Sequence, residues 1–286
     1  MKILIIGLGL IGGSFARTLK YYDETDGGAP RHEVHGFDPD ITTVRKALLV
    51  GACDEAWDKL PPLGGYDVIL LAAYPRASVE FIENHAAEIS PETYVIDLGG
   101  IKRVVCEAGF AAAAAYGFTF IGGHPMAGTQ FSGFGASKES MFTGASMILV
   151  PPQDIDVAHL DFAVKFVKSV GFSAVSVTTA ENHDEIIAYT SQLAHVLSNA
   201  YVKSPTAKRH RGYSAGSFRD LTRVAHLNAK MWAELFMDNG DVLVPEIEGL
   251  AHALLEYADA IKAGDEARLT TLLAEGSAIN DDIKKD

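Results

Sequence analysis

The sequence predicts a doubly wound α/β domain over residues 1–178, followed by an all-helical domain over residues 179–286. The chain has 286 residues, which exceeds the usual single-domain size of about 100 to 200 residues, so two domains are expected. Up to about residue 178, short β-rich runs alternate with helical patterns, which is typical of parallel βαβ units. After Thr179 the β-rich runs disappear and helix-period patterns dominate.

Seven short runs are expected to form the strands of the first domain. Several are apolar almost throughout, as expected when helices cover both faces of a sheet. They are KILIIG at 2–7, HEVHGF at 32–37, DVILLAA at 67–73, TYVIDL at 93–98, FTFIGG at 118–123, SMILVP at 146–151 and FSAVSVT at 172–178. Helices are expected between them at 11–21, 41–49, 77–87 and 157–170, and a loop rich in Gly, Pro and Asp at 23–31.

Two long amphipathic segments define the predicted helical domain. The first spans residues 181–202 and carries acidic residues in its first turn, and the second spans 244–264 and ends at Gly264. Pro205 and Gly212 interrupt the region between them.

Composition excludes several classes of partner. A formal net charge of −13 gives no attraction to phosphate backbones or anionic lipid, so nucleic acid and membrane partners are not expected. Cys53 and Cys106 are the two cysteines, too few for a disulfide framework, and a reducing cytoplasm is the expected location. The chain starts directly on an apolar strand without a signal-peptide pattern, and no apolar run reaches the about 18 residues that span a bilayer.

The stretch GLGLIGGS at 7–14 places three glycines in GxGxxG spacing between a predicted strand and a predicted helix. Gly7 permits a tight turn, Gly9 lets the backbone approach a pyrophosphate, and Gly12 permits close packing of helix on strand. This context favours a Rossmann-type dinucleotide site over the alternative, a plain tight turn. The cofactor-binding residues expected are Gly7, Gly9, Leu10, Ile11, Gly12, Asp38 and Ala73.

Asp38 ends the second predicted strand, where such folds place a carboxylate that accepts hydrogen bonds from ribose hydroxyls. A carboxylate there repels a 2′-phosphate, so the cofactor expected is NAD rather than NADP. Two observations support other interpretations of the cofactor and of Asp38. Arg31 and Arg45 are near in sequence, and Asp38 could instead cap the helix that starts at Ile41.

His124, in IGGHPMAGT at 121–129, has no histidine, cysteine or carboxylate near it in sequence that could share a metal. It follows a predicted strand, on the side of the sheet where a doubly wound fold binds ligands. Hydride removal from an alcohol needs a group that takes the hydroxyl proton, and imidazole titrates near neutral pH. The alternative is a histidine that hydrogen-bonds to the loop backbone. No metal site and no covalent nucleophile are expected.

Several segments together resemble the prephenate dehydrogenase and arogenate dehydrogenase family over nearly the whole chain. They are the glycine loop, DLGGIK at 97–102, GGHPMAGTQFSGFGAS at 122–137, ENHDEIIAYTSQLAHV at 181–196, GSFRDLTRVA at 216–225 and MWAELF at 231–236. The resemblance implies a Rossmann-type domain and an all-helical domain through which two subunits form a homodimer. It implies NAD-dependent oxidative decarboxylation of prephenate to 4-hydroxyphenylpyruvate in tyrosine biosynthesis, with arogenate dehydrogenase activity as the alternative.

By the same resemblance His124 is the catalytic histidine, and Arg223 binds a substrate carboxylate through its planar fork of donors. The alternative to this substrate-binding role is a surface salt bridge between Arg223 and Asp220. The resemblance also implies that further residues line the substrate site, namely His195, Gln130, Gly216 and Trp232. For His195 and Trp232 a place in the helical core is the competing interpretation, and for Gly216 the start of a helix.

Three positions depart from the family pattern. Gly100 stands where many relatives have serine, Gln130 where some have glutamate, and Gln192 where a histidine is frequent. The neutral Gln130 favours prephenate over arogenate, whose ammonium group would favour a nearby carboxylate. A β-hydroxyacid-type dehydrogenase and a cofactor-binding regulator without turnover remain alternatives. The first usually relies on a helical-domain lysine in a motif that is not recognised here, and intact His124 and Arg223 argue against the second.

Overall fold

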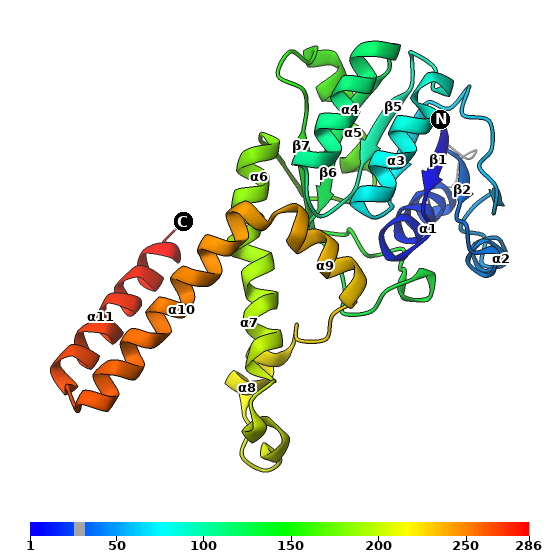
Figure 1. The fold of residues 1–286 in the computed structure, drawn as a ribbon. Helices are drawn as coiled ribbons and strands as arrows, with labels where there is room; N and C mark the ends of the chain where they lie inside the picture. The colour runs from blue at the N-terminus through cyan, green and yellow to red at the C-terminus, as the bar shows by residue number, and fades with distance from the viewer. Residues whose placement is uncertain (26–31, 286) are drawn as a thin grey trace.

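The computed structural model describes residues 1–25 and 32–285. In this part of the chain eight strands form one sheet in the order β3-β2-β1-β4-β5-β6-β7-β8, and helices follow in a second part (Figure 1). The strands are β1 (Lys2–Ile6), β2 (Glu33–Phe37), β3 (Glu55–Trp57), β4 (Val68–Leu71), β5 (Tyr94–Asp97), β6 (Thr119–Pro125), β7 (Ser146–Val150) and β8 (Ala174–Val177). The predicted fold class, a Rossmann-type sheet domain with a helical domain, is confirmed.

The helices of the sheet domain are α1 (Leu10–Thr25), α2 (Ile41–Leu49), α3 (Pro75–His85), α4 (Arg103–Tyr116) and α5 (Val157–Ser169). Those of the second part are α6 (Ala180–Ile187), α7 (Ala194–Tyr201), α8 (Gly216–Thr222), α9 (Ala229–Asp238), α10 (Gly240–Ala263) and α11 (Glu266–Ile283). No helix in the described ranges is both long enough and apolar enough to cross a membrane. Residues 26–31 of the predicted loop lie outside the described part.

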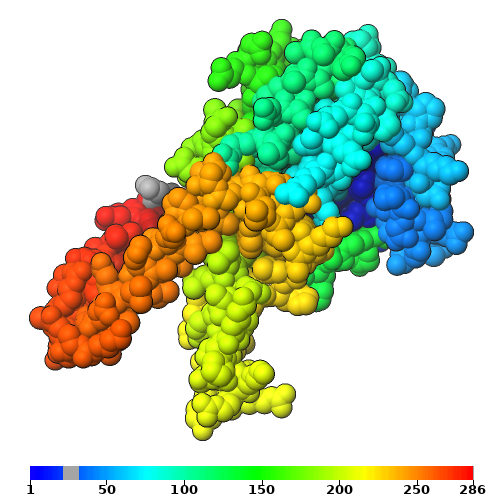
Figure 2. Space-filling model, in the orientation of Figure 1, coloured from blue at the N-terminus to red at the C-terminus, as the bar shows by residue number. Residues whose placement is uncertain are grey.

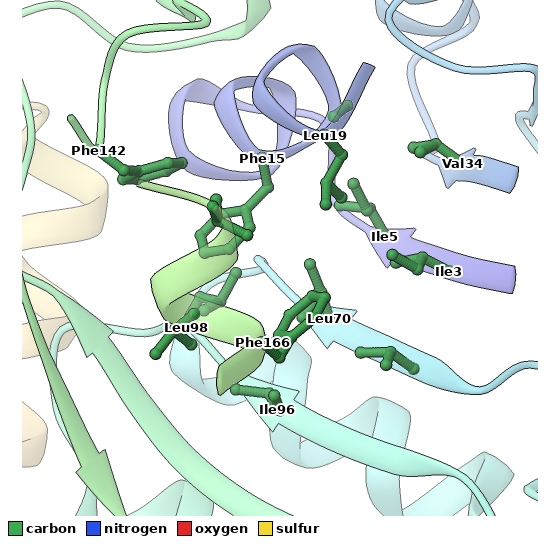
Figure 3. Close-up of a cluster of buried hydrophobic side chains, with 14 of the residues drawn as sticks. Ile3, Ile5, Phe15, Leu19, Val34, Leu70, Ile96, Leu98, Phe142 and Phe166 are labelled. Carbon is green, nitrogen blue, oxygen red and sulfur yellow. The ribbon is translucent and has the colours of Figure 1, made fainter. Parts of the chain in front are cut away.

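Two apolar clusters cover the two faces of the sheet. Alternate residues of β1 point to opposite faces, so that Ile3 and Ile5 join one cluster and Leu4 and Ile6 the other. The first cluster packs α1 and α5 on the sheet, and Figure 3 shows Phe15 of α1 and Phe166 of α5 among strand residues. The second packs α3 and α4 on the opposite face. This double cover explains why the strands are apolar almost throughout.

The direction of β7 departs from the pattern of parallel βαβ units that the sequence indicated for the first domain. β7 pairs antiparallel with β6, and His124 lies opposite Ile148. The connection between the two strands holds a short 3₁₀ helix at Phe134–Ala136 in place of a full crossover helix. An antiparallel neighbour can be reached by a loop, whereas a parallel one needs a helical crossover, so the prediction was wrong for this pair. The unit β7-α5-β8 is again parallel.

The helical part departs from regular α-helix at one point. The predicted segment 181–202 forms α6 and α7 joined by a π-helical stretch at Ala188–Leu193. π-Helical stretches are rare in proteins, and those that occur are often found at functional sites. Beyond it, α10 ends at Gly264, whose φ of 65° lies in the left-handed region that glycine adopts easily. Figure 2 shows α10, α11 and the segment after α7 extending away from the sheet domain.

Candidate active site

The carboxyl edge of the parallel strands carries the residues predicted to bind the cofactor. The strand order reverses between β1 and β4, which is where an open α/β sheet binds ligands. Gly7 has φ of 92°, and a Cβ there would lie 2.8 Å from the carbonyl oxygen of Ala72 and 3.3 Å from the nitrogen of Ala73. The glycine turn after β1 therefore touches the end of β4.

The other two glycines of the motif differ in their surroundings. A Cβ on Gly12 would lie 1.9 Å from the carbonyl oxygen of Gly7, so this position requires glycine. A Cβ on Gly9 would meet no atom within 4 Å, which leaves its backbone open to a ligand. Leu10 and Ile11 form the first turn of α1, whose N-terminus presents free N–H groups to a phosphate. This arrangement fits a dinucleotide pyrophosphate.

Asp38 is tied to the glycine loop. One carboxylate oxygen accepts a hydrogen bond from the backbone nitrogen of Leu8 at 2.9 Å, and the other accepts from the nitrogen of Asp40 at 2.9 Å. Asp40, and not Asp38, caps α2 by accepting from Thr42, so the capping alternative is excluded. Arg31 lies outside the described residues, and Arg45 is exposed on α2. A carboxylate has lone pairs for several donors, so Asp38 can still accept ribose hydroxyls.

His124 lies near the end of β6, on the same edge of the sheet as the glycine loop. Three strand spacings separate β1 from β6, which is roughly 14 Å across the sheet. The imidazole is half-buried. A Cβ built on Gly100 would lie 4.0 Å from its Nε2 and 3.7 Å from Leu235, so the glycine leaves room for a side chain or ligand atom beside this nitrogen.

The Nδ1 atom of His124 is held by a second histidine. It lies 2.9 Å from Nε2 of His183, and Nδ1 of His183 lies 2.7 Å from Oδ1 of Asp184. His183 and Asp184 are buried on α6, 59 and 60 residues after His124. Three side chains from two parts of the chain therefore form one hydrogen-bonded series.

Asp184 is anchored at the start of α4. Its Oδ1 accepts from the backbone nitrogen of Lys102 at 2.7 Å, and its Oδ2 accepts from that of Arg103 at 2.9 Å. Burial opposes ionisation, but the hydrogen bonds from His183 and from the backbone of Arg103 and Lys102 dominate and lower the pKa of Asp184. The carboxylate is therefore charged at neutral pH.

Burial holds the pKa of His124 well below its usual value, and the positive charge of Lys102, together with repulsion between the protonated forms of His124 and His183, acts in the same direction. Lys102 is fully buried in an ion pair with Asp97, and its Nζ also donates to the carbonyl oxygen of Gly123 at 2.7 Å. His124 is thus a neutral imidazole at physiological pH, which is the form that accepts a proton.

His183 and Asp184 were not singled out as site residues from the sequence, although they lie in the predicted amphipathic helix and in the segment 181–196 that carries the resemblance. A signal was present. Ala180, His183, Asp184 and Ile187 follow i, i+3, i+4, i+7 spacing and form the buried face of α6. A histidine and an aspartate on such a face need buried partners, and this pattern points to a polar network.

Three of the predicted substrate residues meet on the helical side. His195 of α7 stacks on Trp232 of α9 with ring centroids 4.0 Å apart. Burial lowers the pKa of His195, a hydrogen bond to the Ser191 carbonyl opposes this, and the charge of nearby Arg223 lowers it further. The exposed guanidinium of Arg223 has no ion-pair or hydrogen-bond partner among residues 1–25 and 32–285, so the salt bridge with Asp220 is not formed.

The remaining predicted positions are less closely tied to the site. Gly216 is the first residue of α8 and a Cβ there would meet nothing within 4 Å, which agrees with the helix-start alternative. Gln130 is exposed in the segment after His124. Gln192 is buried in the π-helical stretch, where it donates to the carbonyl of Leu235 and accepts from Asn239. Its role in this structure is to join α9 and α10 to the α6–α7 segment.

A dinucleotide-binding edge with a neutral imidazole beside it defines a nicotinamide-dependent dehydrogenase. One family model, described as the nucleotide-binding domain of prephenate dehydrogenase, matches residues 22–176. A second, described as the dimerization domain of prephenate dehydrogenase, matches residues 179–275. The chain belongs to the prephenate dehydrogenase family.

Individual relatives agree with this family. The prephenate dehydrogenase of Lactococcus lactis is 28% identical over 286 residues, covering 97% of this chain and 76% of the relative. A crystal structure of prephenate dehydrogenase from A. aeolicus, in complex with hydroxyphenyl propionate and NAD+, is similar with a TM-score of 0.84 and 26% identity, covering 99% and 98% of the two chains. Synechocystis arogenate dehydrogenase is similar with a TM-score of 0.78 and 25% identity, covering 99% and 100%.

The lowered histidine pKa values predict a loss of stability at mildly acidic pH. His124, His183 and His195 all have pKa values below 6.5 in the folded protein, so as the pH falls through 6.5 the unfolded chain takes up protons that the folded chain does not. At pH 5.5 a His124 that stays neutral costs roughly 1.4 kcal/mol of stability, and His183 and His195 act in the same direction. Asp184 and Asp241, whose pKa values are lowered below 3.8, add nothing between pH 7.5 and 5.5.

Thermal unfolding at fixed protein concentration should therefore show a lower Tm at pH 5.5 than at pH 7.5. The variant His124→Asn should show a smaller decrease, since one of the three histidines is gone. An equal Tm at both pH values would contradict the buried neutral state of these histidines.

Proposed function

We propose that the protein catalyses the NAD-dependent oxidative decarboxylation of prephenate to 4-hydroxyphenylpyruvate. The observation that carries the proposal is the orientation of His124, whose Nδ1 is held by His183 and whose Nε2 faces the space beside Gly100. The glycine loop lies on the same edge of the sheet and suits NAD. Membership of the prephenate dehydrogenase family supports the substrate.

For this reaction the protein has to orient the substrate against the cofactor and to supply one proton acceptor. The glycine loop and Asp38 would hold NAD, which would supply the acceptor for the hydride from the ring carbon that bears the hydroxyl. His124 takes the hydroxyl proton at Nε2, the bond between the ring and its carboxylate breaks, and CO2 leaves while the ring becomes aromatic. The electrons of the broken bond reach the ring oxygen, which takes the proton back to give the hydroxyl of 4-hydroxyphenylpyruvate. Aromatisation provides the driving force, and burial keeps His124 neutral and ready to accept the proton.

Arg223 is the proposed partner of a substrate carboxylate. Its guanidinium has no counter-charge in the described part of the chain, and it lies close enough to His195 to lower the pKa of that imidazole. A planar fork of donors suits the two oxygens of a carboxylate and keeps its charge throughout turnover. His195 and Trp232 then form the wall beside it. Gln130 and Gly216 are proposed as further substrate contacts.

Arogenate is the second candidate substrate. The similarity to Synechocystis arogenate dehydrogenase favours it, while the neutral Gln130 favours prephenate, because the arogenate ammonium would be stabilised by a carboxylate. The β-hydroxyacid alternative is weaker, since models of the prephenate dehydrogenase family match both parts of the chain.

The protein is further proposed to act as a cytoplasmic homodimer, divided at residue 178 into a nucleotide-binding and a dimerisation domain. The matched family model describes residues 179–275 as a dimerization domain. Large apolar side chains are exposed on α10 and α11, which extend from the rest of the chain (Figure 1). They are Val244, Leu254, Leu255, Ile261, Leu273, Ile279 and Ile283. Two free, buried cysteines suit a reducing compartment.

The substrate is tested by following NADH formation from NAD with purified prephenate and, separately, with arogenate. We expect prephenate to give the higher kcat/KM. A higher value with arogenate would reverse the substrate assignment and leave the dehydrogenase in place. No NADH from either substrate would overturn the proposed function.

The variant His124→Asn tests the base. Asparagine keeps a polar group at the site but cannot take up a proton, so kcat should fall by about 10²- to 10⁴-fold while NAD binding is unchanged. NAD affinity is measured by calorimetry. The control is His159→Asn on α5, where the imidazole hydrogen-bonds to the hydroxyl of Tyr94 away from this edge. Full activity of the His124 variant would refute its assigned role.

The variant Arg223→Ala tests the carboxylate contact. Loss of charge-assisted hydrogen bonds worth roughly 1.5–3 kcal/mol should raise KM by about 10- to 150-fold and affect NAD binding little. Arg268→Ala on α11 removes a surface arginine that pairs with Glu256, and serves as the control. An unchanged KM for the Arg223 variant would remove this residue from the substrate site.

A further inference from the structure

The N-terminus of α4 is capped by a residue from the other part of the chain. Lys102, at the cap position, makes no side-chain cap of its own. The carboxylate of Asp184 on α6 instead accepts from the backbone nitrogens of Lys102 and Arg103. A helix N-terminus favours negative charge, and Arg103 adds its Nε at 3.3 Å from Oδ2. Asp184 is therefore an acceptor toward every group that contacts it.

This fixed charge determines where the protons of both histidines lie. Because the Asp184 carboxylate can only accept, Nδ1 of His183 must carry the hydrogen in their 2.7 Å bond. A neutral His183 then has a lone pair on Nε2, which accepts from Nδ1–H of His124 across 2.9 Å. His124 is thus left with a lone pair on Nε2, the nitrogen beside Gly100.

We propose that Asp184 and His183 are positioning residues that hold His124 in the tautomer with an unprotonated Nε2. The proposal rests on the proposed role of His124 as the proton acceptor. It assigns neither residue a contact with substrate. Neither residue releases or gains a proton. The hydroxyl proton of the substrate goes to Nε2 of His124, while Nδ1–H continues to donate to His183.

Arg103 connects this series to the junction between the two parts. Its Nη2 donates to Oδ1 of Asn239 at 2.8 Å, and its Nη1 donates to Oδ2 of Asp241 at 2.7 Å. Asn239 also donates to the carbonyl of Asp184 at 2.9 Å. The groups that face Asp184 therefore come from α4, α6 and the start of α10. Asp241 lies in the same junction but does not contact either histidine.

The variant Asp184→Asn separates charge from shape. When the asparagine amide nitrogen takes the position of Oδ2, the backbone N–H and the Nε–H of Arg103 lose their acceptor. With it in the Oδ1 position, only the Lys102 N–H loses its acceptor, and the amide can donate to Nδ1 of His183. The second orientation is favoured because fewer donors are left without acceptors. It moves the hydrogen of His183 to Nε2 and that of His124 to Nε2 as well.

The direct measurement is the tautomer of His124, read from imidazole ¹⁵N chemical shifts of the protein labelled at histidine, without substrate. The signals are assigned with His124→Asn and His183→Gln. We expect the hydrogen on Nδ1 of His124 in the unmodified chain and on Nε2 in Asp184→Asn. In the same variant kcat should fall by about 10²- to 10⁴-fold at every pH with little change in KM, as in triads where the equivalent change enforces the wrong tautomer.

Two comparisons distinguish positioning from a general structural role. Asp241→Asn breaks the ion pair of Arg103 at the same junction and should leave the His124 tautomer and kcat nearly unchanged. His183→Gln offers a carbonyl oxygen near the former Nε2 and should retain the Nδ1–H tautomer with more activity than His183→Leu, which offers no acceptor. The His183 pair keeps the proposal testable if Asp184→Asn does not fold.

Hydrogen on Nε2 of His124 in the unmodified chain would overturn the proposal, as would an unchanged tautomer in Asp184→Asn or equal kcat for the two His183 variants. Because the tautomer is read without substrate, the result stands apart from the substrate assay. Failure of prephenate and arogenate as substrates would overturn the proposed function and leave the tautomer assignment intact.

Discussion

The carboxylate of Asp184 is the group on which the arrangement of the site depends. It joins the two parts of the chain by capping α4 from α6, and it contacts His183, which in turn contacts His124. A buried carboxylate without these donors would be costly, so the cap and the histidine series stabilise each other. The same contact that fixes the position of the helical part therefore also prepares the base.

Much of the fold could be predicted from the sequence, because its signals are local. The helix predicted at 41–49 agrees with the observed bounds of α2, Ile41–Leu49, and all seven predicted strands are present. The three-residue strand β3 and the helix α4 were missed, and β3 is too short for a periodic pattern. The antiparallel β7 depends on a pairing that no local pattern specifies.

The site residues, like the elements of the fold, were predicted where the signal is local and missed where it depends on contacts distant in sequence. The glycine loop, Asp38 and His124 were identified because each belongs to a short motif or follows a strand. The contact between His124 and His183 joins residues 59 apart, and it could not be read from spacing. Gln192, regarded as a departure from the family pattern, has a structural explanation in its buried hydrogen bonds to Asn239 and Leu235. The sequence patterns could not show how the helices of the second part dock on the sheet domain.

The most direct test of the account is a crystal structure of the protein with NAD and a non-reactive analogue that carries the ring hydroxyl. We expect this hydroxyl within hydrogen-bond distance of Nε2 of His124, about 2.6–3.2 Å, while Nδ1 remains bonded to His183. A hydroxyl bound to another residue, or a His124 ring turned so that Nε2 contacts His183, would contradict it.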